Sequence, residues 1–430
     1  MDSISGRSSH GASEPRPPVL VICGSGNAGH ALAVATSQSF DGAVDWLVGS
    51  EEKAERLRRS VLDNGLQSTG VIEARADRLR TISSDPAQVI PDADLVLIAV
   101  PAFAHASVLS RIGPHVSQRT AIGCLPTRGG FEFEASQLVS GDGATRRHRR
   151  IFGLQTLPWS TRVVSPGEVV HFGAVKAEVV MAALPPNEGP GLARQLSKIL
   201  GTQIVATHAF LNLTLGNPGQ FIHPGLMYGH FRFWDGEEYD DDSIPMFYAG
   251  VTDDMGSLVE QLSYDATAVA RAIEEKSNGA LDLSGVVPVH EWLKASYSEV
   301  TADQTSVASC FRTGPIQARQ APVTEVGAGR YVPNFTYRYL SEDVPFGLVI
   351  TKGIAEVANV ATPAIDDVIY WAQSKMGKCY LTERKLEGPD ARDLPIPQNY
   401  GIATLSDLIA WYNDDAMTPR QSEPDYAPAS

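Results

Sequence analysis

The chain has 430 residues, enough for two or three packed domains when one domain takes roughly 150 residues. Apolar residues make up 43% and charged residues 20% of it, which is typical of a globular protein and excludes a disordered or fibrous one. Its 50 acidic and 35 basic residues give a net charge of −15, which disfavours nucleic acid and acidic membranes as partners.

The cysteines and the N-terminus indicate where such a protein works. Four cysteines lie far apart without a CxxC pair, which fits neither a disulfide framework nor a structural zinc site, so we expect a reducing cytoplasm and no metal. The first 18 residues lack the apolar core of a secretory signal, and no stretch approaches about 20 uninterrupted apolar residues, so we expect neither export nor a membrane span. Residues 1–17 are predicted to be a flexible arm and residues 413–430 a flexible tail.

Residues 18–206 alternate between strands and helices. Short apolar runs at Val19–Cys23, Ala43–Val48, Asp94–Val100 and Thr120–Leu125 predict buried strands of a parallel sheet. Helices are expected up to Gln38, over Glu51–Leu62 and near Phe131–Leu138, and further strands around Ile151, Val169 and Val179. The pattern predicts an α/β fold with a Rossmann-type doubly wound sheet as a dinucleotide-binding domain.

Residues 207–412 read as a mostly α-helical second domain in which regular strands stop. Apolar residues at positions 255, 258, 262, 266, 269 and 273 recur every three or four residues, which predicts one buried helix face. Thr362-Pro363 predicts a helix start, and Gly377 predicts its end in the left-handed conformation. We expect this domain to bind the substrate.

A glycine turn follows the first predicted strand and opens the first predicted helix. In Gly24-x-Gly26-x-x-Gly29 the first glycine permits a tight turn, the second lets the backbone approach a pyrophosphate, and the third lets helix and sheet pack closely. The helix N-terminus attracts the phosphate charge. The candidate cofactor-binding residues of the turn are Gly24, Ser25, Gly26, Asn27, Ala28 and Gly29.

The choice of nicotinamide cofactor depends on the residues about 20 positions after the turn. No acid stands at the end of the second strand itself, where the chain reads Val48-Gly49-Ser50-Glu51-Glu52. Glu51 or Glu52 could reach the ribose hydroxyls, whereas Ser50 with Arg56 could accept a 2′-phosphate. We favour NAD(H) and keep NADP(H) open.

His223 is the candidate proton donor at the start of the second domain. It lies in the segment Asn217–Gly225, where a cleft between the two domains is expected, and an imidazole can exchange a proton near neutral pH. Related two-domain dehydrogenases for glycerol 3-phosphate, 6-phosphogluconate and ketopantoate use a lysine in this region. This chain has none between Lys198 and Lys276, which favours His223; the alternative is a buried histidine that only packs.

Several further motifs make the chain resemble the opine dehydrogenase family, and within it the octopine dehydrogenase branch. The resemblance runs along almost the whole chain and is carried by Gly24–Gly29, Val100–His105, Leu125–Pro126 with Gly130–Phe133, Thr156–Trp159, Phe221–Pro224, Arg338–Pro345, Trp371–Gln373, Gly377–Lys378 and Pro397–Gly401. It implies reductive joining of a 2-oxo acid, usually pyruvate, to an amino acid by a reduced nicotinamide cofactor.

The resemblance also implies roles for individual residues. His223 matches the catalytic acid/base, Asp343 the acid that orients and charges it, Arg338 the arginine near the substrate carboxylate, and Pro101 a cofactor-binding position. A carboxylate on one imidazole nitrogen fixes the tautomer, and a guanidinium binds a carboxylate with two parallel hydrogen bonds. The alternative is that Arg338 and Asp343 form an ordinary surface ion pair.

Arg128 departs from the family, in which an uncharged residue is usual at this position. As an added cation facing the cleft, it would disfavour a cationic amine such as arginine and favour alanine, glycine, β-alanine or taurine; the alternative is an arginine exposed to solvent. Gln155 and Thr161 are also expected to line the amine pocket.

These observations predict an NAD(P)H-dependent opine dehydrogenase whose substrates lie between its domains. One alternative is a simple 2-oxo acid or alcohol dehydrogenase that uses the same histidine. Another is a noncatalytic nicotinamide-sensing protein that uses only the glycine turn. The residues do not specify the amine, the oligomeric state, the physiological direction or the role of the N-terminal arm.

Overall fold

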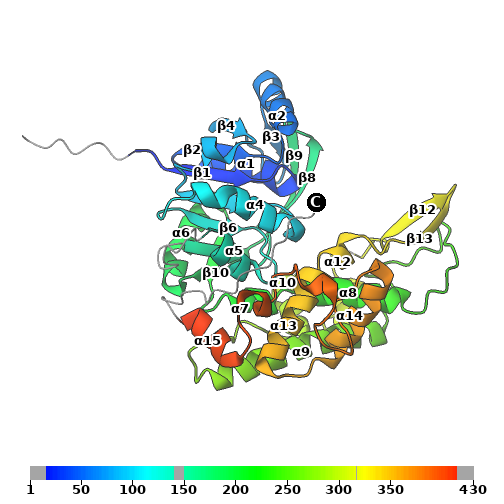
Figure 1. The fold of residues 1–430 in the computed structure, drawn as a ribbon. Helices are drawn as coiled ribbons and strands as arrows, with labels where there is room; N and C mark the ends of the chain where they lie inside the picture. Colours follow the sequence, from blue (N-terminus) through cyan, green and yellow to red (C-terminus); the bar gives the residue numbers. More distant parts are fainter. Residues whose placement is uncertain (1–15, 140–149, 316, 414–430) are drawn as a thin grey trace, which may run out of the picture.

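A computed structural model describes residues 16–139, 150–315 and 317–413 (Figure 1). The predicted arm and tail lie outside these residues, except for Arg16, Pro17 and Asn413, the last of which ends helix α15.

A twisted eight-stranded sheet with the order β11-β10-β7-β6-β5-β1-β2-β4 forms the centre of the N-terminal domain. Its strands in chain order are β1 (Val19–Cys23), β2 (Ala43–Leu47), β4 (Leu79–Ser83), β5 (Leu95–Ile98), β6 (Ala121–Cys124), β7 (Arg150–Leu154), β10 (Glu178–Leu184) and β11 (Gln203–Ala206). All neighbouring strands pair in parallel except β7 and β10. β1, β5 and β6 are buried on both faces, because each is apolar throughout, which confirms the predicted doubly wound sheet.

Helices cover both faces of this sheet, and the two faces belong to different hydrophobic cores. The helices are α1 (Asn27–Ser39), α2 (Glu51–Asn64), α3 (Pro86–Val89), α4 (His105–Ile112), α5 (Phe131–Val139) and α6 (Gly189–Leu200). Leu20 and Ile22 of β1 join the core beneath α1 and α6. Val19 and Val21 point the other way, as alternation in a strand requires, into a core shared with α4, α5 and the second domain. The helical domain therefore packs on the α4–α5 side of the molecule.

A second, three-stranded sheet in the N-terminal domain includes segments that the sequence did not indicate as strands. Its order is β3 (Gln67–Gly70), β9 (Val169–Val175) and β8 (Trp159–Ser165). Of these, only β9 was expected as a strand. The sheet packs against α1: Asn27 Oδ1 accepts a hydrogen bond from Val163 N at 2.8 Å.

The second domain is built from helices: α7 (Leu211–Leu215), α8 (Gly219–Phe231), α9 (Asp253–Lys276), α10 (Val289–Tyr297), α11 (Val307–Thr313), α12 (Arg338–Ser341), α13 (Val349–Ala358), α14 (Pro363–Met376) and α15 (Leu405–Asn413). The predicted stripe of α9 is buried, apart from half-buried Leu258. Gly377 ends α14 at a φ of 64°, as predicted. Thr362 precedes α14, but its hydroxyl donates to Asp366 Oδ1 and does not cap a backbone N–H.

Strands do not stop at residue 207, so that prediction is wrong. β12 (Val323–Gly327) and β13 (Arg330–Pro333) form an antiparallel hairpin that projects from the helical domain (Figure 1). Gly329 supplies the positive φ of 67° in its turn. The hairpin lacks the long apolar runs used to recognise strands, because its β12 residues are mostly exposed.

Helix α15 returns to the N-terminal domain and packs its aromatic rings on α5. The Phe133 and Trp411 ring centroids are 4.8 Å apart, and Tyr412 Oη donates to Glu132 Oε1 at 2.8 Å. Thr214 of α7 donates to the same oxygen at 2.6 Å. Burial raises the pKa of Glu132 to about 7, although both hydroxyl donors oppose the shift. An acid thus lies at the junction of α5, α7 and α15 without a cationic partner among the described residues.

Glu132→Gln is expected to stabilise the protein relative to the native chain increasingly as the pH rises from 5 to 8. An acid whose pKa is raised on folding contributes most below its unfolded pKa of about 4.5 and loses that contribution as the pH passes about 7. The shift corresponds to roughly 3 kcal/mol. Thermal unfolding of both proteins at pH 5 and pH 8 measures the effect, with Glu52→Gln on the exposed face of α2 as the control. A difference in melting temperature that does not change with pH would contradict the assignment.

Candidate active site

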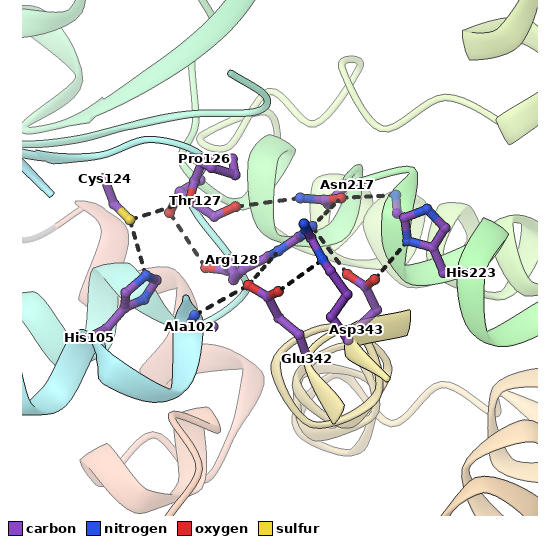
Figure 2. A network of polar contacts seen from close by, with 12 residues as sticks. Ala102, His105, Cys124, Pro126, Thr127, Arg128, Asn217, His223, Glu342 and Asp343 are labelled. Atoms are coloured by element: carbon purple, nitrogen blue, oxygen red, sulfur yellow. Dashed lines mark hydrogen bonds and ion pairs between the residues drawn. The ribbon is translucent and has the colours of Figure 1, made fainter. Parts of the chain in front are cut away.

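His223 and Asp343 form a hydrogen-bonded dyad in the helical domain. His223 lies on α8, and its Nδ1 is 2.7 Å from Oδ2 of Asp343, which follows α12 (Figure 2). Asp343 is only 1% exposed. Burial favours its protonated form, but Arg128 and His223 outweigh that effect and lower the pKa of Asp343 below its usual range.

An ionised carboxylate only accepts hydrogen bonds, so Nδ1 of His223 carries the proton in this contact. Nε2 is therefore the nitrogen that can exchange a proton with another molecule. The imidazole stacks on the Tyr339 ring with centroids 3.9 Å apart and an interplanar angle of 13°. Because the ring is clamped by Tyr339 and Asp343, its orientation does not depend on a ligand.

Arg128, which the sequence predicted as an added cation facing the cleft, is buried behind the dyad and paired with carboxylates. It lies in the loop after β6, and its Nη1 is 3.2 Å from Asp343 Oδ1 and 3.1 Å from Asn217 Oδ1. Its Nε is 3.6 Å from Glu342 Oε1. Solvent exposure is also ruled out, since the residue is 8% exposed. The charge of Arg128 is thus matched by two carboxylates, although the residue still borders the cavity described below.

Arg338 pairs with Glu342 and not with Asp343, the partner considered in the sequence analysis. Its Nε is 3.6 Å from Glu342 Oε2, and its side chain is 57% exposed. It borders the same cavity as His223. A half-exposed guanidinium beside the dyad can bind a carboxylate with two parallel hydrogen bonds.

A cavity of about 350 Å³ lies between the two domains and brings the candidate residues together. Its N-terminal-domain wall includes Gln155, Leu157, Trp159 and Lys176, and its helical-domain wall includes His223, Arg338, Tyr248, Trp292, Tyr297 and Phe311. Gln155 lines it as predicted, and its amide donates to Gly216 O at 3.2 Å. Thr161, which pairs with Phe172 in the β8–β9 ladder, is not among the residues that line it. No Asp or Glu is among the described residues that line it.

The glycine turn has the shape that a dinucleotide requires. A Cβ on Gly29 would lie 2.0 Å from Gly24 O, so strand and helix pack as closely as the motif predicts. Gly24 has a φ of +118°. A Cβ on Gly26 would meet nothing within 4 Å, so the open side of the turn has room for a pyrophosphate at the start of α1.

The remaining cofactor candidates surround this turn. Ser25 and Ala28 are half-buried in it, and Pro101 is exposed in the loop after β5. The same loop is adjacent to the turn, since a Cβ on Gly24 would lie 2.4 Å from Ala99 O. The side chain of Asn27 is directed to β8 by its bond with Val163 N. Buried His30 was not singled out in the sequence: its Nδ1 donates to Gly26 O, and its Nε2 accepts from Gly167 N at 2.9 Å.

The side chains considered as contacts of the cofactor ribose or its 2′-phosphate all lie at the start of α2. Ser50 caps this helix by accepting from Lys53 N. Glu51 accepts hydrogen bonds from Ser84 and Arg58, which lower its pKa. Glu52 and Arg56 pair with each other at 3.3 Å. The acids and the arginine are therefore each engaged by a neighbouring side chain.

Sequence reasoning missed several side chains of this site. Tyr339 and Glu342 lie inside the motif Arg338–Pro345, and Asn217 lies in the same segment as His223. Their position beside predicted site residues was the signal that could have identified them. Lys176 and the aromatic residues of the helical-domain wall (Tyr248, Trp292, Tyr297 and Phe311) had no signal, because they are scattered along the chain and meet only in the folded protein.

Among the residues described, no group of three or more His, Cys, Asp or Glu is placed to hold a metal ion. None of the helices described is both long and apolar enough to cross a membrane.

Comparison with known families matches the two halves of the chain separately. Residues 206–376 match the family described as NAD/NADP octopine/nopaline dehydrogenase, alpha-helical domain. Residues 20–186 match the ketopantoate reductase PanE/ApbA family, a match that ends before the helical domain.

Whole-chain relatives and solved structures agree with the first of these matches. Tauropine dehydrogenase of Arabella iricolor is 32% identical over 412 residues, covering 91% of this chain and all of that protein. Opine dehydrogenase of Haliotis discus hannai is 31% identical, covering 91% and 98%. A structure of octopine dehydrogenase with NADH and L-arginine superposes with a TM-score of 0.83 at 28% identity, covering 92% of this chain and 98% of that one. This chain therefore belongs to the opine dehydrogenase family.

Proposed function

We propose that this protein is an NAD(P)H-dependent opine dehydrogenase that joins a 2-oxo acid, pyruvate, to the amino group of an amino acid or taurine-like amine. The observation that carries the proposal is the His223–Asp343 dyad beside Arg338 in an interdomain cavity. Residues 18–206 would hold the cofactor, and residues 207–412 complete the substrate cavity. Relatives whose names include tauropine, opine and octopine dehydrogenase support it, as does an octopine dehydrogenase structure with NADH and pyruvate.

The side chains suit each stage of the condensation. Amine and 2-oxo acid combine to a carbinolamine, which loses water to form an imine. Nε2 of His223 gives and takes the protons of these steps, while Asp343 holds Nδ1 and stabilises the imidazolium. Arg338 binds the carboxylate of the 2-oxo acid. When bound, the reduced nicotinamide cofactor supplies the hydride that converts the imine to the secondary amine.

Walls from both domains restrict water around the reacting atoms, which favours imine over hydrolysis back to ketone. The backbone of Gly24–Gly29 would hold the cofactor pyrophosphate at the N-terminus of α1. We favour NAD(H), with NADP(H) as the alternative, because the solved octopine dehydrogenase structures that this chain resembles contain NADH.

The charge of the cavity supports an amine with a neutral or anionic side chain, such as alanine, glycine, β-alanine or taurine. Lys176 and Arg338 border the cavity, whereas no acid does among its described lining residues. Asp343 and Glu342 are already paired with cations behind that wall. A guanidinium side chain would therefore lose hydration without gaining a carboxylate partner. This reason replaces the added charge of Arg128, on which the sequence-based expectation depended.

A substrate panel tests the function and the amine class together. NADH or NADPH oxidation is followed at 340 nm with pyruvate alone, with each amine alone and with both. We expect turnover only with both, and kcat/KM for alanine or taurine at least about tenfold above that for arginine and agmatine. Turnover of pyruvate without amine would establish a simple 2-oxo acid dehydrogenase instead. Cofactor binding without turnover across the panel would favour a sensing protein.

We also infer that the protein works in the cytoplasm. All four cysteines are free thiols: Cys23, Cys124 and Cys310 are buried and Cys379 is half-buried. Such thiols persist in a reducing compartment.

A further inference from the structure

The two oxygens of Asp343 are held by residues from different domains. Oδ2 contacts Nδ1 of His223 within the helical domain, whereas Oδ1 contacts Nη1 of Arg128 from the N-terminal domain (Figure 2). Asp343 and Arg128 are 1% and 8% exposed, so little water is available to replace either contact. Whatever holds Arg128 therefore also determines how Asp343 meets the imidazole.

Arg128 is anchored on the helical domain by a connected set of bonds. Asn217 accepts from its Nη1 at 3.1 Å, and the next residue, Gly129, donates its backbone N–H to Phe346 O at 2.9 Å. Glu342 accepts the backbone N–H of Ala102 at 3.3 Å. Ala102 follows Pro101 in the loop beside the glycine turn, so the carboxylates of this network contact both domains.

The geometry points to Arg128 as a positioning residue that acts through Asp343: we propose that it shares the negative charge of the carboxylate that contacts Nδ1, so that His223 releases its proton at a lower pH. Without Arg128, the full negative charge of Asp343 would act on the imidazolium and stabilise it more strongly.

Other groups also face His223 and stay constant in the comparison that tests this. They are Tyr339 and Arg338 from α12, Tyr248 and Lys176 on the cavity wall, and Arg319, which lies over the ring of Tyr339. Glu342 is the other carboxylate beside Arg128, and it is altered deliberately in the test.

The test compares Glu342→Gln with the double variant Arg128→Met/Glu342→Gln. Arg128→Met alone would leave Asp343 without its arginine and Glu342 with only the half-exposed Arg338, a change that could prevent folding. The double variant loses one cation and one carboxylate, so its local net charge equals that of the native protein. It differs from Glu342→Gln only by the loss of the Arg128 cation. The readouts are the titration midpoint of the His223 imidazole by NMR, assigned with His223→Asn, and the pH dependence of kcat and KM in both reaction directions.

In the double variant we expect the imidazole midpoint about one pH unit above that of Glu342→Gln. Glu342→Gln itself should lie at or below the native midpoint, because Arg128 then has Asp343 as its one carboxylate partner. The reductive and oxidative pH profiles should move with the midpoints, and kcat should fall by roughly tenfold or more in the double variant while KM for pyruvate changes little.

Other outcomes would overturn the proposal. An unmoved midpoint with a KM raised many-fold would return Arg128 to direct substrate contact, and an unmoved midpoint with unchanged kinetics would make it a purely structural residue. If the double variant does not fold, a midpoint of Glu342→Gln above the native value still contradicts the proposal. The kinetic measurements rest on the proposed function, but the NMR titration does not. Failure of the proposed role of Arg128 can therefore be distinguished from failure of the proposed function.

Discussion

Replacing His223 by Asn is expected to lower kcat for the reductive condensation by roughly 10²- to 10⁴-fold, the range over which a positioned acid/base contributes. The variant removes Nε2, the nitrogen free to exchange a proton, and leaves Arg338 and the glycine turn in place. NADH binding should therefore stay unchanged. Steady-state rates with saturating pyruvate and amine, together with a fluorescence titration of NADH, measure both quantities.

His208→Asn provides the matched control. This imidazole is also next to an aspartate, with Nε2 3.8 Å from Asp282 Oδ2, but its side chain is 79% exposed and does not border the cavity. Its activity should equal that of the native chain. If His223→Asn retained more than about a tenth of native kcat, another residue would have to supply the proton and the assigned role of His223 would be wrong.

Gly26→Ala is expected to weaken NADH binding by roughly tenfold or more without unfolding the protein. The added methyl group meets no protein atom within 4 Å, so the turn itself tolerates it. It would occupy the open side of the turn, where the pyrophosphate must approach the backbone. A titration of NADH and a thermal melt of each variant separate affinity from stability.

Two further glycine variants serve as comparisons for this prediction. Gly191→Ala on α6 also places its methyl in open space, but far along the chain from the turn, so it should change neither NADH affinity nor melting temperature appreciably. Gly29→Ala should fail differently, by destabilising the fold, because its Cβ would lie 2.0 Å from Gly24 O. Unaltered NADH affinity in Gly26→Ala would place the cofactor elsewhere.

Much of the N-terminal domain could be predicted because its signals are local. Runs such as Leu95–Ile98 are buried on both faces, and their apolar composition is visible without knowing their neighbours. The hairpin β12–β13 and the strands β3 and β8 escaped prediction for the opposite reason. Their residues are largely exposed or polar, and they are strands because of the partners they pair with.

Arg128 shows the same contrast between local and long-range signals within the candidate site. The sequence identified its position near the expected cleft and its departure from the family, but treated it as a cation available to the substrate. Whether a guanidinium is available depends on which carboxylates lie within about 4 Å, and Asp343 is 215 residues further along the chain. Arg338 shows the same dependence, since the alternative weighed from the sequence was a surface ion pair with Asp343, whereas its partner is Glu342, one residue earlier.

The amino-acid sequence was sufficient to predict the wound sheet, the glycine turn, the helical second domain and the family to which His223, Arg338 and Asp343 point. These depend on side-chain period, on local backbone requirements of glycine and on motifs of a few residues. The folded protein was needed to see which charges meet, which aromatic rings line the cavity and that α15 returns to the first domain. Charge pairing and desolvation act through distances between residues remote in the chain, and those distances exist only once both domains are packed together.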